Sequence, residues 1–334
     1  MKKKILILFC GGTIIMKEND NGVLDAPEKN EAIDILLNLE PKLNTIADLT
    51  IDFIANIDST NITPVIWDRI CAEIYKNYAK YDGFVITHGT DTMAYTAAAL
   101  SLGLQSLGKP VVLTGSQIPG CELNTDARRN IVNALKLAVM DVCGVFLVFD
   151  ERIISGMRAT KASESKLDAF KTVNYPDIGE IKINIKLKSS VHRRHNKLPV
   201  LKTGFNSDIF IYKLAPGCDP EDLEYLLNND RIKGIIIEAF GTGNIPDNFS
   251  AFFTEANRKK IPVIVTSQCL HGMTMMKSYA VGQKALELGV IEGYDQSIET
   301  LTVKLMWALE HYKYEEIRGI INKNFTGEID LSYL

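Results

Sequence analysis

Apolar and polar positions along the chain follow two patterns, one typical of buried strands and the other of helices. Between short apolar runs, apolar residues recur at helical spacing, as Ile66, Ile70 and Ile74 do after Thr63-Pro64. The predicted strands are 5–9, 83–86, 110–114, 144–149, 234–238 and 261–265. Further helices are predicted at 94–100, 127–140, 248–259, 295–311 and 315–322. Strands that alternate with helices in this way indicate a parallel sheet covered by helices.

The fold class predicted from this pattern is α/β. We expect a doubly wound, mainly parallel sheet in a larger N-terminal domain, together with a smaller α/β C-terminal domain. Residues 181–187 alternate with a period of two, which predicts a half-exposed strand, whereas residues 189–198 are polar and lack periodicity. The predicted domains are therefore 1–188 and 209–334, joined by a linker at 189–208.

Polar residues gather where two of the predicted strands end. The strand at 5–9 runs into Gly11-Gly12-Thr13, and the strand at 83–86 runs into His88, Thr90 and Asp91. Ligands of open α/β sheets bind at the carboxyl ends of the strands, where the first N–H groups of the next helix are unpaired. A threonine at such a junction is also typical of a helix N-cap, so a site and a cap are both open interpretations.

Composition and charge narrow the class of protein. The 334 residues are 46% hydrophobic and carry a formal net charge of −4 without a basic stripe, which gives no reason to expect nucleic acid or anionic membrane as a partner. The apolar run after Lys2-Lys3-Lys4 stops at Gly11, too early for an export segment or a membrane span. The six cysteines lack CxxC spacing and are predicted to be reduced. We therefore expect a cytoplasmic protein.

Several kinds of site lack their sequence motif. The chain has no GxGxxG after a strand, no GxxxxGK[ST] loop, no GxSxG elbow and no zinc-type histidine spacing. A dinucleotide cofactor, a phosphate-binding loop and a zinc site are therefore unsupported. His88 neighbours Thr90, so a Thr–His catalytic couple stands beside the alternative of a structural histidine.

Threonine chemistry without histidine is the remaining candidate. A threonine hydroxyl is a weak nucleophile, so it needs a proton acceptor and also amide donors for the oxyanion that forms on attack. Lys161 is a candidate for the proton path if Asp91 holds its ammonium group near Thr90. An exposed, solvated lysine is the alternative.

In their order and spacing, several strings resemble the bacterial L-asparaginases, specifically the cytoplasmic type I branch. The strings are Gly11-Gly12-Thr13-Ile14, Asp58-Ser59, His88-Gly89-Thr90-Asp91-Thr92-Met93, Gly115-Ser116-Gln117-Ile118-Pro119, Ala159-Thr160-Lys161, Ser267-Gln268-Cys269, Tyr279-Ala280-Val281-Gly282 and Gly289-Val290-Ile291. The resemblance covers essentially the whole chain.

The resemblance implies a cofactor-free hydrolysis in which Thr13 attacks the side-chain amide of L-asparagine. Thr90, Asp91 and Lys161 match a second catalytic set that manages proton flow, and an acyl-threonine is then released by water as aspartate.

Substrate binding is implied in the same way. Asp58 and Ser59 match positions that hold the α-carboxylate and α-amino group, and Asp91 also faces the ammonium. Backbone N–H groups around Thr90 and Ser116 would form the oxyanion hole.

The sequence departs from the family pattern at one tyrosine, which many family members carry in the loop after the first threonine. Residues 19–25 contain none, and Val23 stands in its place. Tyr279 is the candidate substitute, with a packing role as the alternative. The composition of residues 19–22 fits a lid over the substrate or a plain solvent loop, and the resemblance favours the lid.

Three functions follow as hypotheses. The first is hydrolysis of L-asparagine, with weaker or no action on L-glutamine. The second is the amidase subunit of a tRNA-dependent amidotransferase, although that relative has an additional domain before the strand that here begins at Ile5. The third is a non-enzymatic asparagine sensor, which only Val23 motivates.

The resemblance also implies a homotetramer, built as a dimer of dimers. Some type I members are activated by asparagine at a second site, and Thr160 and Cys269 fall in segments associated with that regulation. A packing role is the alternative for both residues.

Overall fold

The described residues form two compact units. The structure, a computed structural model, describes residues 2–18, 24–25 and 27–330. The N-terminal unit comprises Met1–Thr172 and Pro176–Thr203, and the C-terminal unit comprises Val173–Tyr175 and Gly204–Leu334. Each unit is described by itself.

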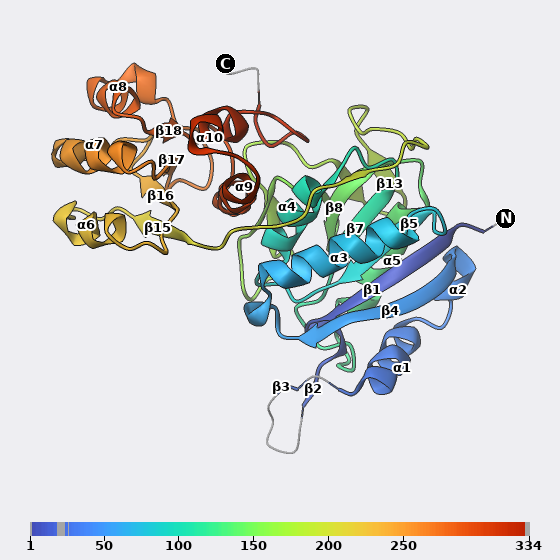
Figure 1. Ribbon diagram of the computed structural model, residues 1–334. Coiled ribbons are helices and arrows are strands. Elements are labelled where there is room, and N and C mark those ends of the chain that lie inside the picture. The colour runs from blue at the N-terminus through green and yellow to red at the C-terminus, as the bar shows by residue number, and fades with distance from the viewer. Residues whose placement is uncertain (1, 19–23, 26, 331–334) are drawn as a thin grey trace. The chain divides into compact units, whose positions relative to one another are not determined.

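The N-terminal unit is built on one large sheet (Figure 1). Its strands, in spatial order, are β13 (Ile185–Leu187), β12 (Gly179–Ile181), β9 (Arg152–Ser155), β8 (Gly144–Phe149), β7 (Pro110–Thr114), β5 (Gly83–Thr87), β1 (Lys4–Gly11) and β4 (Asp48–Ile57). The strands from β4 to β8 pair in parallel, and the remaining pairs are antiparallel. The predicted α/β fold with a mainly parallel sheet is confirmed.

Helices cover both faces of this sheet because its central strands are apolar on both sides. In β1, Leu6 and Leu8 pack in one buried cluster, whereas Ile5, Ile7 and Phe9 pack in another on the opposite face. The first cluster includes residues of α3 (Pro64–Asn77) and α4 (Met93–Gly103), and the second includes residues of α1 (Lys29–Leu39), α2 (Leu43–Ile46) and α5 (Ala127–Val139). The short elements of the unit are β2 (Lys17–Glu18), β3 (Leu24–Asp25), β6 (Leu104–Gln105), β10 (Ala159–Lys161), β11 (Phe170–Thr172), β14 (Val200–Leu201), η1 (Thr13–Ile15) and η2 (Ser59–Asn61).

The strand predicted at 181–187 is instead a hairpin. β12 and β13 pair antiparallel with Ile181 opposite Ile185, and Ile183 between them is 95% exposed. The period-two pattern extends through the turn because the turn residue happens to be apolar, so alternation alone could not locate the reversal.

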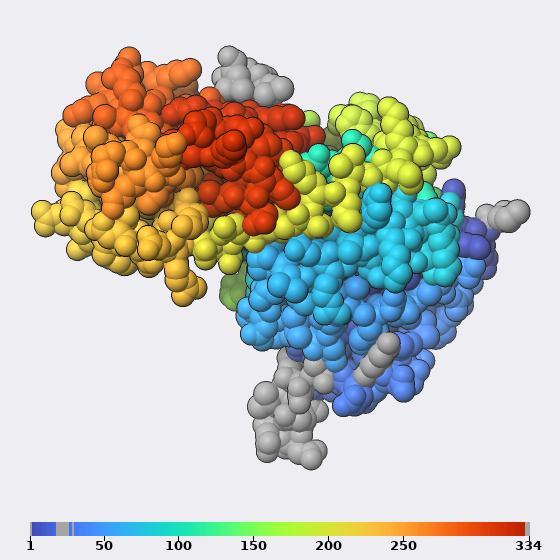
Figure 2. Space-filling model, in the orientation of Figure 1, coloured from blue at the N-terminus to red at the C-terminus, as the bar shows by residue number. Residues whose placement is uncertain are grey.

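Residues 189–203 lie on the N-terminal unit, where the sequence suggested a linker. Arg194 donates to the carbonyl oxygens of Met140 and Ala138, at the end of α5, and β14 pairs with β6. Figure 2 shows this segment in yellow-green and yellow on the surface of the unit. The segment is polar because it lies on the surface, and Arg194 attaches it to the unit through backbone carbonyl groups.

The C-terminal unit repeats the layered arrangement on a smaller parallel sheet (Figure 1). The strands are β15 (Ile209–Lys213), β16 (Gly234–Ala239), β17 (Val263–Ser267) and β18 (Ile291–Glu292). One buried cluster joins the sheet to α6 (Glu221–Leu227), α7 (Ser250–Arg258) and α8 (Ala280–Glu287), and another joins it to α9 (Ile298–His311) and α10 (Tyr314–Ile321). Two 3₁₀ turns are η3 (Asp247–Phe249) and η4 (Met276–Ser278).

Helix ends differ in detail from the sequence prediction. Thr63 occupies the N-cap position of α3, but its side chain makes no capping hydrogen bond there. α9 begins three residues later than predicted, because Ser297 is the N-cap and its side chain accepts a hydrogen bond from the Thr300 N–H.

Gly12 fixes how closely the ends of β1 and β5 approach. A Cβ atom on Gly12 would lie 2.5 Å from the backbone nitrogen of Gly89, and its φ of +96° falls in the region that favours glycine. The backbone of one strand end therefore packs directly on that of the other.

We predict that Gly12→Ala will destabilise the N-terminal unit much more than Gly144→Ala. Gly144 also has a positive φ, of +120°, but a Cβ there would meet no atom closer than 3.7 Å. The control should therefore cost only the backbone strain, about 1–2 kcal/mol, whereas Gly12→Ala should cost on the order of 3 kcal/mol or more. Chemical denaturation of both variants measures the difference, and equal losses would show that the close approach is dispensable.

Candidate active site

The carboxyl ends of four neighbouring strands carry most of the candidate residues. β4, β1, β5 and β7 are adjacent and parallel, with Phe9 opposite Thr87 and Thr87 opposite Thr114. The segments that leave these strands contain Thr13, Asp58 and Ser59, Thr90 and Asp91, and Ser116. Residues from four distant parts of the sequence therefore meet at one sheet edge, where α/β proteins bind ligands.

Glycines allow these segments to pack backbone against backbone. Gly12 lies on Gly89, and a Cβ on Gly89 would lie 2.6 Å from the Ser59 Oγ. A Cβ on Gly115 would collide with the His88 carbonyl oxygen. The segments after β1, β4, β5 and β7 thus form one continuous layer.

Neither catalytic threonine candidate occupies a helix N-cap position. Gly12 is the N-cap of η1, and the half-buried Thr13 follows it. Thr92 is the N-cap of α4, and its hydroxyl donates to the Ser59 carbonyl oxygen at 2.7 Å. The capping interpretation of Thr13 and Thr90 is therefore wrong.

Lys161 brings Thr90 and Asp91 into one hydrogen-bonded set. Its Nζ donates to the Thr90 Oγ1 at 2.8 Å and to the Asp91 Oδ1 at 2.6 Å, although Lys161 and Thr90 are 71 residues apart in sequence. The Lys161 side chain is 18% exposed and the Asp91 carboxylate 54%. The ammonium is thus largely withdrawn from water and paired, while the carboxylate can still meet a ligand.

The predicted substrate-binding residues differ in their hydrogen-bond partners within the protein. The Asp58 Oδ1 accepts from the Thr60 backbone N–H at 2.8 Å and from the Thr60 hydroxyl at 2.9 Å, which caps η2. Ser59 and Ser116 are buried, and the Ser116 Oγ has no hydrogen-bond partner among the described residues. A buried hydroxyl without a partner costs free energy, which fits a group kept for a ligand.

Backbone donors are also available at this edge. The N–H groups of Thr13, Thr90 and Ser116 donate to no other described residue. Such donors at adjacent strand ends can bind a carboxylate or an oxyanion.

His88 is a structural histidine. It is 1% exposed, its Nδ1 lies 2.7 Å from the Gly89 carbonyl oxygen and its Nε2 lies 2.9 Å from the Thr96 hydroxyl. Burial lowers its pKa to about 4, against a smaller opposite effect of the Gly89 carbonyl. With both ring nitrogens occupied, His88 is not positioned as a base for Thr90.

The buried thiol of Cys10, three residues before Thr13 in sequence, is also inert. Burial raises the pKa of Cys10 to about 12, partly offset by the positive charge of Arg69, so its thiolate is not available as a nucleophile at neutral pH.

Two predicted features are not among the described residues of the N-terminal unit. Tyr279 belongs to the C-terminal unit, where it is the N-cap residue of α8 and is 52% exposed. Val23 and the rest of the predicted lid, residues 19–22, lie outside the described residues. Their proposed roles stay predictions.

Thr92 and Thr96 contact candidate residues although the sequence analysis gave them no role. Thr92 binds the Ser59 carbonyl, and Thr96 binds His88. Their positions at the start of α4 were visible in the sequence, but their partners were not.

Neither a metal cluster nor a membrane span is found in the described part of the chain. No group of three or more His, Cys, Asp or Glu side chains there could hold a metal ion. No helix among the described residues is both long enough and apolar enough to cross a bilayer.

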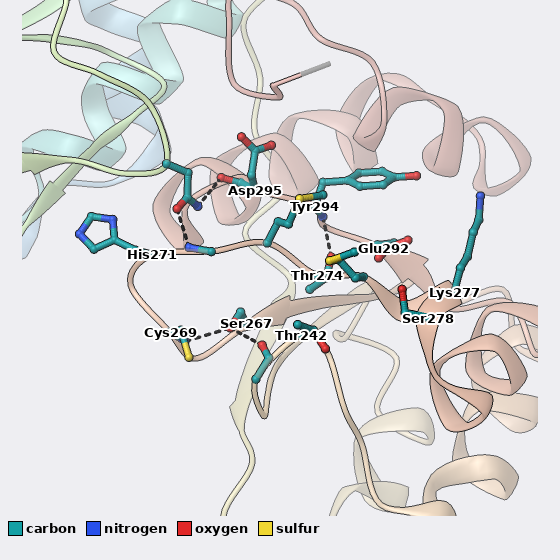
Figure 3. A pocket seen from close by; sticks show the side chains of 15 residues that line it. Thr242, Ser267, Cys269, His271, Thr274, Lys277, Ser278, Glu292, Tyr294 and Asp295 are labelled. Atoms are coloured by element: carbon teal, nitrogen blue, oxygen red, sulfur yellow. Dashed lines mark hydrogen bonds between the residues drawn. The ribbon is translucent and has the colours of Figure 1, made fainter. Parts of the chain in front are cut away.

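The C-terminal unit has a cavity of its own, of about 850 Å³ (Figure 3). Cys269, His271, Thr242 and Ser267 are among its lining residues. The Ser267 hydroxyl donates to the Gly241 carbonyl and accepts from the Cys269 N–H, whereas the buried Thr242 Oγ1 has no partner among the described residues. This cavity is a candidate for a second ligand site.

Known proteins resemble the chain over nearly its whole length. The domain family "Asparaginase, N-terminal" matches residues 4–193, and "Glutaminase/Asparaginase C-terminal domain" matches residues 208–321. The L-asparaginase of Thermococcus kodakarensis is 38% identical, with 98% of this chain and 99% of the relative covered. Its solved structure has a TM-score of 0.90 at 36% identity, covering 98% of this chain and 99% of that one.

Two further relatives bear on the hypotheses. L-asparaginase 1 of Escherichia coli K12 is 35% identical, with 98% of both chains covered. A glutamyl-tRNA(Gln) amidotransferase subunit of Sulfurisphaera tokodaii is 33% identical, with 100% of this chain and 77% of the relative covered. From its two matching domains and these full-length similarities, the chain belongs to the asparaginase family.

Proposed function

We propose that this protein hydrolyses the side-chain amide of L-asparagine to L-aspartate and ammonia. The observation that carries the proposal is the contact of Lys161 with both Thr90 and Asp91, which follow β5, the neighbour of the strand that leads to Thr13. The L-asparaginases among the relatives support the choice of substrate.

The proposed reaction uses two threonines in turn. The Thr13 hydroxyl attacks the amide carbon, and the N–H groups at the strand ends stabilise the oxyanion. The proton of the Thr13 hydroxyl passes to the amide nitrogen, and the tetrahedral intermediate then expels ammonia and leaves an acyl-threonine. A water molecule then attacks the ester carbon, gives up its proton through Thr90 and the Lys161–Asp91 pair, and returns Thr13 to its hydroxyl form.

The amino-acid end of the substrate needs a carboxylate for its ammonium and neutral donors for its carboxylate. The Asp91 carboxylate is paired through Oδ1 with Lys161 and is half exposed, so Oδ2 is the proposed acceptor for the ammonium. Asp58 and Ser59 lie on the segment that follows β4 and are proposed to bind the same end. Glutamine carries one more methylene, so we expect weaker or no activity on it.

The other two hypotheses are less well supported. The amidotransferase relative matches at lower identity, and the chain covers only 77% of it. A sensor would not need the Lys161 contact with Thr90 and Asp91, which is the arrangement that proton transfer requires.

We further propose a cytoplasmic homotetramer, built as a dimer of dimers. All six cysteines are free, as expected in a reducing compartment.

Substitutions at Thr13 and Lys161 test the proposed chemistry. Ammonia release from L-asparagine should fall roughly 10³-fold or more in Thr13→Ala, which lacks the nucleophile. Lys161→Met should lose about 10²–10⁴-fold because proton transfer to and from Thr90 is impaired.

Two exposed residues of the same unit supply controls. Thr45→Ala and Lys186→Met, matched in residue type, should keep wild-type rates. Unchanged turnover in Thr13→Ala would refute the nucleophile assignment. Asparagine binding without any ammonia release from the wild type would favour the sensor.

Tyr279→Phe tests whether that hydroxyl replaces the tyrosine missing from residues 19–25. If it assists Thr13, kcat should fall by roughly 10²-fold at little change in KM, because only proton transfer is affected. Tyr225→Phe, an exposed tyrosine of the same unit, is the control. Equal rates in both variants would assign Tyr279 to packing.

Asparagine activation is proposed at the cavity of the C-terminal unit. Cys269 lines this cavity, whereas Thr160 is buried on β10 of the N-terminal unit. We expect a sigmoidal dependence of rate on asparagine concentration, and Thr242→Val, which removes the unpartnered hydroxyl of a residue that lines the cavity, should make it less steep. A hyperbolic wild-type curve at every protein concentration would refute the activation.

A further inference from the structure

A chain of buried hydrogen bonds reaches from α3 to the segment that carries Thr90. The Trp67 Nε1 donates to the Thr96 Oγ1 at 3.0 Å, and the Thr96 Oγ1 lies 2.9 Å from the His88 Nε2. The His88 Nδ1 lies 2.7 Å from the Gly89 carbonyl oxygen. Trp67, Thr96 and His88 are all buried, so water does not compete for these bonds.

The donor and acceptor properties of these groups set the direction of donation along this series of hydrogen bonds. An indole N–H only donates, so the Thr96 oxygen accepts from Trp67 and is free to direct its own proton to the His88 Nε2. A carbonyl oxygen only accepts, so the His88 Nδ1 carries the ring proton and donates to Gly89. Burial, which lowers the pKa of His88 to about 4, keeps the ring neutral and thereby preserves this pattern.

The hydrogen bond from the His88 Nδ1 holds a peptide group of the proposed active site. The Gly89 carbonyl and the Thr90 N–H belong to the same planar, trans peptide, so they point in opposite directions. A donor that holds the carbonyl on the His88 side therefore aims the Thr90 N–H away from it. That N–H donates to no other described residue, so nothing else in the described structure fixes its direction through a hydrogen bond.

We propose that His88 is a positioning residue, held by Thr96 and Trp67, that orients the Gly89–Thr90 peptide so that the Thr90 N–H is ready to donate to the oxyanion. The inference rests on the proposed amidase function and adds to it. His88 does not touch the substrate in this proposal. Its effect reaches the reaction only through Gly89, so it should change the stabilisation of the transition state more than the binding of the substrate.

Thr96 offers the sharpest test because it lies one hydrogen bond further from the reaction than His88. Thr96→Val keeps the shape of the side chain and removes the proton that His88 Nε2 accepts, so the ring can adopt the other tautomer. We expect kcat for asparagine to fall about 10-fold with KM changed less than about twofold, a fraction of the 10²–10³-fold lost when an oxyanion donor is removed outright.

Two variants separate positioning from stability. Thr96→Ser loses a buried methyl group but keeps the hydroxyl, so its kcat should stay within about twofold of wild type even where its stability is lower. Ser101→Ala removes another buried hydroxyl of α4, one that donates to the Ala97 carbonyl and has no link to Gly89. It should leave kcat unchanged.

His88 itself supplies a further comparison. His88→Asn can place an amide donor where Nδ1 lies and should retain much more of kcat than His88→Leu, which has no donor. Equal losses in the two variants would contradict a role through the Gly89 bond.

The tautomer can be observed without turnover. In ¹⁵N-histidine-labelled protein at pH 7, the His88 signal, assigned by its absence in His88→Asn, should show the Nδ1–H form in wild type and Thr96→Ser and a mixture in Thr96→Val. An Nε2–H form in the wild type would overturn the inference.

The outcomes distinguish the two proposals. An active wild type with unchanged kcat in Thr96→Val overturns the positioning role alone, as does a kcat that follows unfolding free energy across Thr96→Val, Thr96→Ser and Ser101→Ala. A folded wild type that releases no ammonia overturns the proposed function and with it the catalytic purpose of the bond chain.

Discussion

The close approach of Gly12 to Gly89 is the constraint on which the site depends. Parallel strands in register would bring their ends within one strand spacing of each other, but side chains at the turns would hold the backbones apart. Because both residues are glycine, the segment with Thr13 lies directly on the segment with Thr90, and Gly89 in turn lies on Ser59. The proposed nucleophile, a second hydroxyl and unpaired N–H groups can therefore share one small volume.

The candidate site combines two electrostatic environments. On the interior side, Trp67, Thr96 and His88 form a neutral, buried chain that costs little because each donor has an acceptor. On the side proposed to face the substrate, Lys161 and Asp91 form an ion pair, and the carboxylate is about half exposed. A neutral, buried support behind a charged pair suits the proposed reaction, in which protons move while the oxyanion donors stay in place.

The sequence was sufficient for the α/β fold, because apolar runs such as 5–9 and 144–149 indicate strands buried on both faces. The sequence also placed Thr13 and Thr90 just after the ends of two predicted strands. Because parallel strands end at one edge of a sheet, a candidate ligand site could be predicted there. It could not show the contact of Lys161 with Thr90, which closes a loop of 71 residues through a short strand pair outside the main sheet. The hairpin at Ile181–Ile185 escaped prediction for a related reason: local alternation carries no information about which strand a segment pairs with.

His88 illustrates where local reasoning must stop. Its position beside Thr90 suggested a base, and only the partners of its two ring nitrogens separate that role from a structural one. One partner is the carbonyl of the next residue, Gly89, and the other is the Thr96 hydroxyl of α4, to which Trp67 of α3 donates. With both ring nitrogens engaged and its pKa lowered to about 4 by burial, His88 is a poor candidate for proton transfer, and the proposed role stays with Lys161 and Asp91, the titratable pair beside Thr90. The same buried bonds that remove His88 from proton transfer are what allow it to hold the Gly89 carbonyl in place.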